Sequence, residues 1–263
     1  MSDSTHKSLV QHQFGRSAGD YATNDFHAVG ESLAVLNELI APQKDWRILD
    51  VATGAGHTGI LFAPMVAEVV ATDITDEMLA ETLELAGQRK IANLTTAIAD
   101  AESLPFDDQS FDMVTCRLAH HHFVQQQKAI EEFARVLKPG GIIGFTDNYT
   151  VEDPAAAEFY NRYEKIRDPS HFQVHSLGEL EQLFANAGLV IKDSRQLTQE
   201  FEFHKWADRQ RVTDSDKELL LDMLDEAPEL LIPLFKPRKA DGTAYFSLAE
   251  VVLVAETMTE TRS

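Results

Sequence analysis

Three acidic residues, Asp50, Asp73 and Asp100, each stand at the end of a short apolar or alternating run. Residues 54–59, Gly-Ala-Gly-His-Thr-Gly, follow the first acid and precede an amphipathic segment. This order predicts a buried strand, a tight loop and a helix. Glycine lets the backbone turn sharply and lets a ligand approach it, and the free N–H groups at a helix start face that ligand. The pattern therefore predicts a site for a nucleotide-like molecule at the carboxyl ends of strands.

The charges of this pattern restrict the ligand. Asp50 precedes the glycines, where a carboxylate repels a pyrophosphate and suits a cationic amine and sulfonium, although it can also accept hydrogen bonds from the loop. Asp73 comes about 20 residues after Gly54, the spacing at which an acid accepts from ribose hydroxyls; capping the next helix is its alternative role. Asp100 is placed to accept from an adenine amino group. Ala101 is small enough for a backbone N–H to reach a ring nitrogen.

Three consecutive histidines, His120, His121 and His122, follow a predicted buried strand over residues 110–116. Imidazole is a common general acid or base, and the ends of such strands open into the substrate pocket. Adjacent residues point in different directions, so not all three can act, and one can pack inside. Consecutive histidines rarely present three ligands to one ion, so we expect no metal. Cys116 is interpreted as a small core residue, not a nucleophile.

The elements that must position these residues alternate between strand and helix over residues 46–145. This alternation predicts an α/β fold: a doubly wound, mostly parallel sheet with helices on both faces. After residue 150, the sequence predicts helices over 153–167 and 176–188 and a strand over 189–197. Residues 202–240 are predicted to form broken helices, and residues 245–255 the last strand.

In order and spacing, the segments DVATGAGHTG, VVATDIT, ADAESLPFDDQSFDMV and RVLKPGG resemble the class I S-adenosylmethionine-dependent methyltransferases. More narrowly, they are similar to the branch with the ubiquinone/menaquinone C-methyltransferases. The strong part of the resemblance covers residues 46–147, and residues 10–21 resemble the family's lead-in helix and lid. One departure is Ala52, where many members have glycine. Alanine is the smallest replacement and is tolerated if φ there is negative.

The resemblance implies a Rossmann-like fold with seven strands, a C-terminal helical insertion or cap, and S-adenosylmethionine as cofactor. We expect a single methyltransferase domain over residues 1–263; its parts are a lid and lead-in helix (1–45), a cofactor-binding core (46–150), a substrate cap with late core elements (151–240), and a final strand and tail (241–263).

The resemblance also implies site residues. The expected cofactor-binding residues are Asp50, Ala52, Thr53, Gly54, Gly56, Asp73, Ile74, Met78, Asp100, Ala101, Arg117 and Tyr21. Among the catalytic candidates we favour His121, then His122, then His120, as base or substrate orienter. Phe14 and Tyr21 are candidates for a lid whose aromatic faces lie near the sulfonium. Further candidates in the cap are Tyr149, Arg162, Arg167 and His171.

Composition restricts the partners. The chain has 263 residues, 23 basic and 43 acidic, and a formal net charge of −20. Such a surface repels phosphate backbones, so a nucleic-acid substrate is disfavoured. No secretory signal or long apolar span is visible, so we expect a cytoplasmic protein without membrane insertion. The single cysteine excludes an intramolecular disulfide, and a homodimer is left open.

These features predict transfer of a methyl group to carbon or oxygen of a small, aromatic or enolisable molecule. Two alternatives stay open. A nicotinamide-dependent oxidoreductase fits the glycine pattern alone, but residues 120–123 do not supply the expected hydride-site chemistry. A methyltransferase fold can also be non-catalytic or adapted to another reaction.

Overall fold

The protein is described here by a computed structural model that covers residues 3–16 and 30–257. Its centre is a sheet of eight strands in the order β3-β2-β1-β4-β5-β8-β6, with β7 paired to β8 beside this path. The pairs among β1 to β5 are parallel, and the pairs made by β8 are antiparallel. The predicted doubly wound sheet is confirmed; the main path has the seven expected strands, and the short β7 adds the eighth.

The predicted strands are present, but the strand predicted over 189–197 continues to residue 202, and residues 238–240, predicted to be helical, form a short strand. Their bounds are β1 (Arg47–Val51), β2 (Glu68–Asp73), β3 (Leu94–Ile98), β4 (Phe111–Arg117), β5 (Leu137–Asn148), β6 (Leu189–Glu202), β7 (Arg238–Ala240) and β8 (Thr243–Thr257). Strands β2 and β3 are added on one side of β1, and β4 and β5 on its other side. The order of strands along the sheet therefore reverses at β1. In open α/β sheets the crevice outside the carboxyl ends of such strands is where ligands bind.

Helices form in both segments predicted as single helices, 153–167 and 176–188, and others flank the sheet. Their bounds are α1 (Asp3–Gly15), α4 (Glu31–Leu39), α5 (His57–Phe62), α6 (Asp76–Gln88), α7 (Gln126–Val136), α8 (Pro154–Arg167), α9 (Leu177–Asn186), α10 (Phe203–Arg209), α11 (Asp214–Asp225) and α12 (Ile232–Phe235), with short 3₁₀ turns η1 (Ala63–Met65), η2 (His120–His122) and η3 (Glu229–Leu231). Asp153 caps α8 by accepting from the Ala156 N–H, and Ser176 with Glu179 forms a capping box on α9. None of the helices in the described residues is long and apolar enough to span a membrane.

Apolar side chains cover both faces of the sheet. On one face, Phe133 of α7 and Phe184 of α9 pack with Phe145 of β5 in a buried cluster. On the other face, Leu36 of α4 and Phe62 of α5 pack in a second cluster. These two layers hold the strand ends in place, which fixes the edge at which the acidic residues lie.

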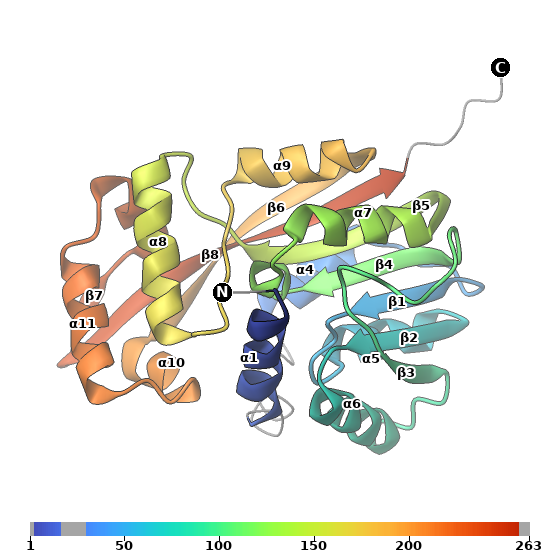
Figure 1. Cartoon of the computed structure of the whole chain (residues 1–263), viewed down its shortest axis with the longest axis horizontal. Coiled ribbons are helices and arrows are strands. Elements are labelled where there is room, and N and C mark those ends of the chain that lie inside the picture. Colours follow the sequence, from blue (N-terminus) through green and yellow to red (C-terminus); the bar gives the residue numbers. More distant parts are fainter. Residues whose placement is uncertain (1–2, 17–29, 258–263) are drawn as a thin grey trace.

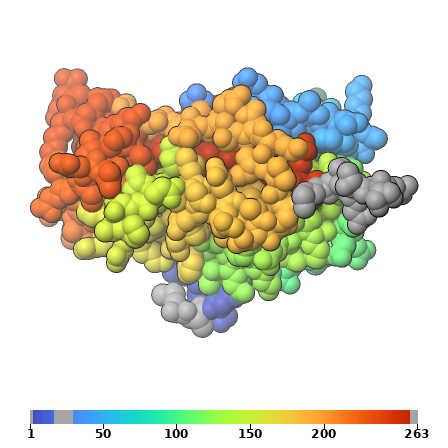
Figure 2. All heavy atoms as spheres, turned by 90° about the horizontal axis from the view of Figure 1, so that it is seen from above, coloured from blue at the N-terminus to red at the C-terminus, as the bar shows by residue number. Residues whose placement is uncertain are grey.

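A third apolar cluster forms beyond the sheet, around Tyr163, Trp206, Phe235 and Phe246. It joins α8, α10, α11 and α12 to the outer part of β8, and we call these four helices the cap. Figure 1 shows the cap at one end of the molecule, β3 and α6 at the other, and α1 between α10 and α6. Seen from above, the red-orange residues of the cap form one end of an elongated body (Figure 2).

Candidate active site

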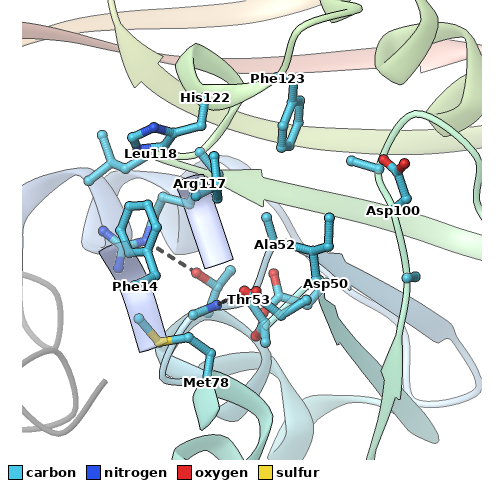
Figure 3. A pocket seen from close by; sticks show the side chains of 18 of the residues that line it. Phe14, Asp50, Ala52, Thr53, Met78, Asp100, Arg117, Leu118, His122 and Phe123 are labelled. Atoms are coloured by element: carbon cyan, nitrogen blue, oxygen red, sulfur yellow. Dashed lines mark hydrogen bonds between the residues drawn. The ribbon is translucent and has the colours of Figure 1, made fainter. Parts of the chain in front are cut away.

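One cavity opens at the carboxyl ends of β1, β2 and β4, and helix α1 closes it with Lys7, Val10 and Phe14. The predicted cofactor residues that line it are Asp50, Ala52, Thr53, Gly54, Asp73, Ile74, Met78, Asp100, Ala101 and Arg117. Figure 3 shows Phe14 and Met78 on one side of the cavity and Asp100 on the other. Gly56 lies outside the lining, and Tyr21 lies outside the described residues. The predicted residues thus converge, and their binding roles stay predictions.

Asp50 holds the glycine-rich loop against the sheet. Its Oδ1 accepts from the Thr115 hydroxyl at 2.6 Å, and its Oδ2 accepts from the Thr53 hydroxyl at 2.5 Å and the Gly59 N–H at 2.9 Å. Burial raises the pKa of Asp50, and these donors offset that effect only in part. The loop-holding role that the sequence left as an alternative is therefore present, alongside a carboxylate on the cavity wall.

Gly56 supports the loop from behind. Its φ is +86°, and a Cβ there would lie 2.6 Å from Cγ2 of Thr82 on α6. Only glycine fits both restrictions. Thr82 in turn donates from its hydroxyl to the Gly54 carbonyl at 2.8 Å. Gly56 therefore brings the loop close to α6 and shapes the cavity without lining it.

Ala52 does not have the negative φ on which tolerance of alanine depends. Its φ is 50°, in the left-handed region, and Leu118 across the cavity has a φ of 54°. Strained residues of this kind cluster at functional sites, where the surrounding structure holds them. The family resemblance gave a signal for this strain, because it implies glycine at the position of Ala52.

Replacing Ala52 by glycine should raise the free energy of unfolding by about 0.5–1 kcal/mol. The left-handed conformation costs a non-glycine residue about 1–2 kcal/mol, and the greater freedom of glycine in the unfolded chain returns part of that gain. The midpoint of guanidinium unfolding measures it. Ala71→Gly, in β2 and without a positive φ, is the control and should destabilise. An equal loss in both variants would contradict strain at Ala52.

Asp73 ties two backbone segments together at the end of β2. Its Oδ2 accepts from the Gly54 N–H at 3.0 Å, and its Oδ1 accepts from the Thr75 N–H at 2.9 Å. The side chain is buried, and burial raises the pKa of Asp73. A carboxylate oxygen can accept a second hydrogen bond, and Asp73 lines the cavity. Thr75 stands at the N-cap of α6 and makes no side-chain capping bond.

Asp100 is engaged by a lysine that the sequence pattern did not reveal. Lys7 Nζ of α1 donates to Asp100 Oδ2 at 2.8 Å and to Glu102 Oε2 at 2.5 Å. Glu102 is buried, and its other oxygen accepts from the Val124 and Gln125 N–H groups. Lys7 therefore fastens α1 to the wall that carries Asp100. A single lysine on a polar helix gives no local signal of such a contact.

The three histidines have different surroundings. His120 is buried, and its ring packs edge-on against Phe123 and Phe145. Burial lowers the pKa of His120 to about 4. It is therefore the histidine that packs inside, as the sequence allowed for one of them.

His121 pairs with a carboxylate from β5. Its Nδ1 lies 2.5 Å from Asp147 Oδ1, and its backbone N–H donates to Asp147 Oδ2 at 2.9 Å. Burial lowers the pKa of His121, but the Asp147 carboxylate outweighs burial, so the pKa is raised. The pKa of Asp147 is lowered by the same pairing, against its own burial. The pairing therefore favours the charged forms of both side chains, beside the cavity. Sequence reasoning missed Asp147, although it too ends a strand.

His122 lines the cavity, and His121 does not. The rings of His122 and His121 are 4.1 Å apart, and the ring of Phe14 meets the ring of His122 edge-on at 4.9 Å. His122 Nδ1 lies 3.0 Å from the Ser170 carbonyl oxygen, which only accepts hydrogen bonds. Nδ1 therefore carries the proton, and Nε2 keeps its lone pair. Burial and the neighbouring His121 lower the pKa of His122 to about 4, so its ring is neutral at pH 7.

The other candidates have structural contacts. Tyr149 donates from its hydroxyl to Gln196, and the Arg167 guanidinium lies 4.5 Å over the ring of Trp206. His171 is buried with Nε2 at 2.8 Å from Asn161 Oδ1, and burial holds its pKa well below the usual value. Arg162 does not line the cavity. Cys116 is buried, and burial raises the pKa of its thiol well above the usual value.

The cavity as a whole suits a cationic nucleoside better than a pyrophosphate. Three carboxylates line it at successive strand ends, and no three His, Cys, Asp or Glu side chains within residues 3–16 and 30–257 form a metal site. Gly54, at φ +55°, has nothing within 4 Å of where a Cβ would be, so its backbone is open to the cavity.

Known proteins match this architecture. Residues 49–145 match the methyltransferase domain family. The chain is 37% identical over 205 residues to the uncharacterized methyltransferase YcgJ of Bacillus subtilis, covering 78% of this chain and 81% of that protein. The crystal structure of YcgJ superposes with a TM-score of 0.82 at 31% identity, covering 86% of this chain and 98% of that chain. A ubiquinone/menaquinone biosynthesis C-methyltransferase, UbiE of Marinomonas sp., is 28% identical over 158 residues, 52% of this chain and 63% of that protein.

The strand order, the acids at the strand ends and these matches all point to a methyltransferase. They exclude the alternative of a nicotinamide-dependent oxidoreductase. The chain belongs to the class I S-adenosylmethionine-dependent methyltransferases, with S-adenosylmethionine as its cofactor.

Proposed function

We propose that the enzyme transfers a methyl group to a carbon or oxygen atom of a small, aromatic or enolisable molecule. The observation that carries this proposal is the histidine pair beside the cavity: the neutral ring of His122 lies 4.1 Å from the ring of His121, which is paired with Asp147. A base next to a hydrogen-bond donor suits an acceptor that loses a proton and develops negative charge on oxygen.

The cavity residues fit S-adenosylmethionine by their chemistry. Asp73 has acceptor sites for the two ribose hydroxyls, and Asp100 with the Ala101 backbone suits the adenine edge. The cationic Arg117 suits the carboxylate of the amino-acid part, and Gly54 leaves room for it because no atom lies within 4 Å of where its Cβ would be. Phe14 offers an aromatic ring near the sulfonium. When bound, the cofactor supplies an activated methyl group on sulfur.

His122 is proposed as the general base. It is neutral, it lines the cavity, and the Ser170 carbonyl holds its proton on Nδ1, which leaves the Nε2 lone pair to accept the acceptor's proton. This order reverses the sequence-based preference for His121. The reason is that the pairing with Asp147 raises the pKa of His121, and an imidazolium has no lone pair to offer.

His121 lies beside the cavity with its side chain 13% exposed, and it is proposed to orient an acceptor that reaches past His122. With Nδ1 held by Asp147, its Nε2–H can donate to the oxygen that becomes negative as the acceptor loses its proton. Cavity closure by α1 excludes water, so such a charge-assisted hydrogen bond is stronger than in solution. In this proposal, the protein's own residues remove the acceptor's proton, orient the acceptor and exclude water.

Two observations support a small acceptor over a nucleic acid. The formal net charge of −20 repels phosphate backbones. The UbiE relative carries the name of a C-methyltransferase of ubiquinone and menaquinone biosynthesis, which supports an aromatic, quinol-like acceptor for this enzyme as well. Residues 151–240, which include the cap, are proposed to form the acceptor side of the site.

The test has two steps. Calorimetry should show binding of S-adenosylmethionine and none of NAD. The enzyme is then incubated with S-adenosylmethionine labelled in its methyl group and with pools of small phenols, quinols and enolisable ketones. Label should pass to a small organic product. Label that enters only RNA or protein, with every small-molecule pool unlabelled, would overturn the proposal.

The pH profile should separate the two histidines. If His122 is the base, kcat/KM stays level from about pH 6.5 down to about pH 5 and falls only toward its pKa of about 4. The rate also falls as pH rises through the raised pKa of His121, because its imidazolium is lost. If His121 were the base, the rate would fall as pH drops below a pKa above 6.5. The carboxylates of Asp147, Glu164 and Asp168 raise the pKa of His121, and those of Asp168 and Asp147 act in the same sense on His122. The ring of His171 lies 5.6 Å from that of His121.

A further inference from the structure

A chain of side-chain hydrogen bonds joins helix α1 to His122. Its members, in order, are Arg16, Gln13, Gln210, Asp168, Ser170 and His122. All except Arg16 are buried. They come from α1, from the end of α10, from the loop after α8 and from η2, so only the folded chain brings them together.

The hydrogen bonds between α1 and the cap have a forced direction. Arg16 Nη2 donates to Gln13 Oε1 at 2.9 Å, Gln13 Nε2 donates to Gln210 Oε1 at 2.7 Å, and Gln210 Nε2 donates to Asp168 Oδ2 at 3.2 Å. A guanidinium can only donate and a carboxylate can only accept. The two amides between them must therefore lie head to tail, and each polarises the next.

On the other side of Asp168 the hydrogen bonds also run toward this carboxylate, from His122 through Ser170. Asp168 Oδ1 accepts from both the backbone N–H and the hydroxyl of Ser170, at 2.8 and 2.5 Å. The Ser170 hydroxyl, having donated its proton, can only accept from His122 Nδ1, which lies 3.3 Å away. The Ser170 carbonyl accepts from the same Nδ1 at 3.0 Å. Both acceptors thus place the proton on Nδ1.

Helix α1 meets His122 in two other ways. His6 Nε2 lies 3.0 Å from the His122 carbonyl oxygen, and the ring of Phe14 packs on the His122 ring. The same helix closes the cavity through Lys7 and Phe14. The helix that lines one side of the cavity therefore also supplies one end of the hydrogen-bond chain.

We propose that Gln13, Gln210 and Asp168 are positioning residues that hold His122 in the Nδ1-protonated tautomer, so that docking of α1 prepares the base. The effect of this tautomer on catalysis rests on the proposed function, in which His122 removes the acceptor's proton. The tautomer itself does not depend on the identity of any acceptor. Docking of α1 then closes the cavity and aims the Nε2 lone pair in one step.

The sharpest variant is Gln13→Glu, which keeps the shape of the side chain and its acceptor for Arg16. A carboxylate paired with Arg16 cannot donate to Gln210, so the direction of the chain is broken while α1 keeps its contact. Asp168→Asn breaks the chain at the other end without any change in α1. Ser8→Ala is the control on α1, because the exposed Ser8 hydroxyl donates only to the Ser4 carbonyl in the same helix.

The main readout is ¹⁵N NMR of the His122 ring at pH 7 in the protein alone, with the signal assigned through a His122→Gln variant. The wild type and Ser8→Ala should show one tautomer, protonated on Nδ1. Gln13→Glu and Asp168→Asn should show a mixture with Nε2-protonated ring, and kcat should fall about 10-fold with the KM for S-adenosylmethionine unchanged. A wild-type ring protonated on Nε2, or a tautomer unchanged in both variants, would overturn the inference. The NMR measurement needs no methyl acceptor. A failure of this inference is therefore distinguishable from a failure of the proposed function, which the methyl-transfer screen tests.

Discussion

Replacing His122 by glutamine should lower kcat by about 10²–10⁴-fold, the usual contribution of a general base. The neutral ring lines the cavity, and its Nε2 is the lone pair that the fold leaves for the acceptor's proton. Glutamine keeps a polar side chain of similar length but has no basic nitrogen. The measurement is turnover with an acceptor identified in the methyl-transfer screen, together with the affinity for S-adenosylmethionine, which should change little.

The matched control is His121→Gln in the same turn. It leaves the buried Asp147 without its imidazole partner, so the free energy of unfolding should fall, and the KM for the acceptor should rise because the oxygen donor is lost. A kcat that survives in His122→Gln and collapses in His121→Gln would assign the base to His121. Full turnover in both variants would mean that alignment alone carries the reaction.

Replacing Asp73 by alanine should weaken binding of S-adenosylmethionine by about 1.5–3 kcal/mol, the value of hydrogen bonds to a charged acceptor. The carboxylate is buried at the end of β2, and it holds the Gly54 N–H while its other acceptor sites face the cavity. Alanine removes the acceptors for the ribose hydroxyls and also releases the loop. Calorimetric titration of the folded variant gives the loss directly.

Two further variants separate binding from loop support. Asp73→Asn keeps one oxygen acceptor and should lose part of the affinity. Asp76→Ala removes an exposed acid from the first turn of α6 and should leave affinity unchanged. If Asp73→Ala binds S-adenosylmethionine as tightly as the wild type, Asp73 supports the loop only.

The cofactor side of the site could be predicted from the sequence because its signals are local. A run of apolar residues, an acid and a glycine turn specify β1 and the loop after it, and the parallel pairing of β1 with β2 and β4 brings their carboxyl ends to one edge. Local signals also placed α8 and α9, since Asp153 and Ser176 act as caps where the sequence predicted them.

The catalytic side depends on contacts that no local pattern carries. Asp147 reaches His121 because β5 pairs with β4 in a register that sets Thr146 beside Arg117. The left-handed φ of Ala52 is imposed by the loop around it, since an alanine by itself prefers negative φ.

The sequence by itself therefore determined the fold, the cofactor and the wall of acids, because strand ends, glycine turns and caps are encoded by neighbouring residues. Only the tertiary structure decided which histidine lines the cavity and which of its ring nitrogens carries the proton. His122 meets Ser170 across 48 residues and His6 across 116, and such contacts are set by the packing of α1 and the cap against the sheet. Burial and fixed hydrogen-bond partners, which exist only after that packing, separate three adjacent and chemically identical side chains: the pKa of His120 and of His122 is lowered to about 4, and that of His121 is raised.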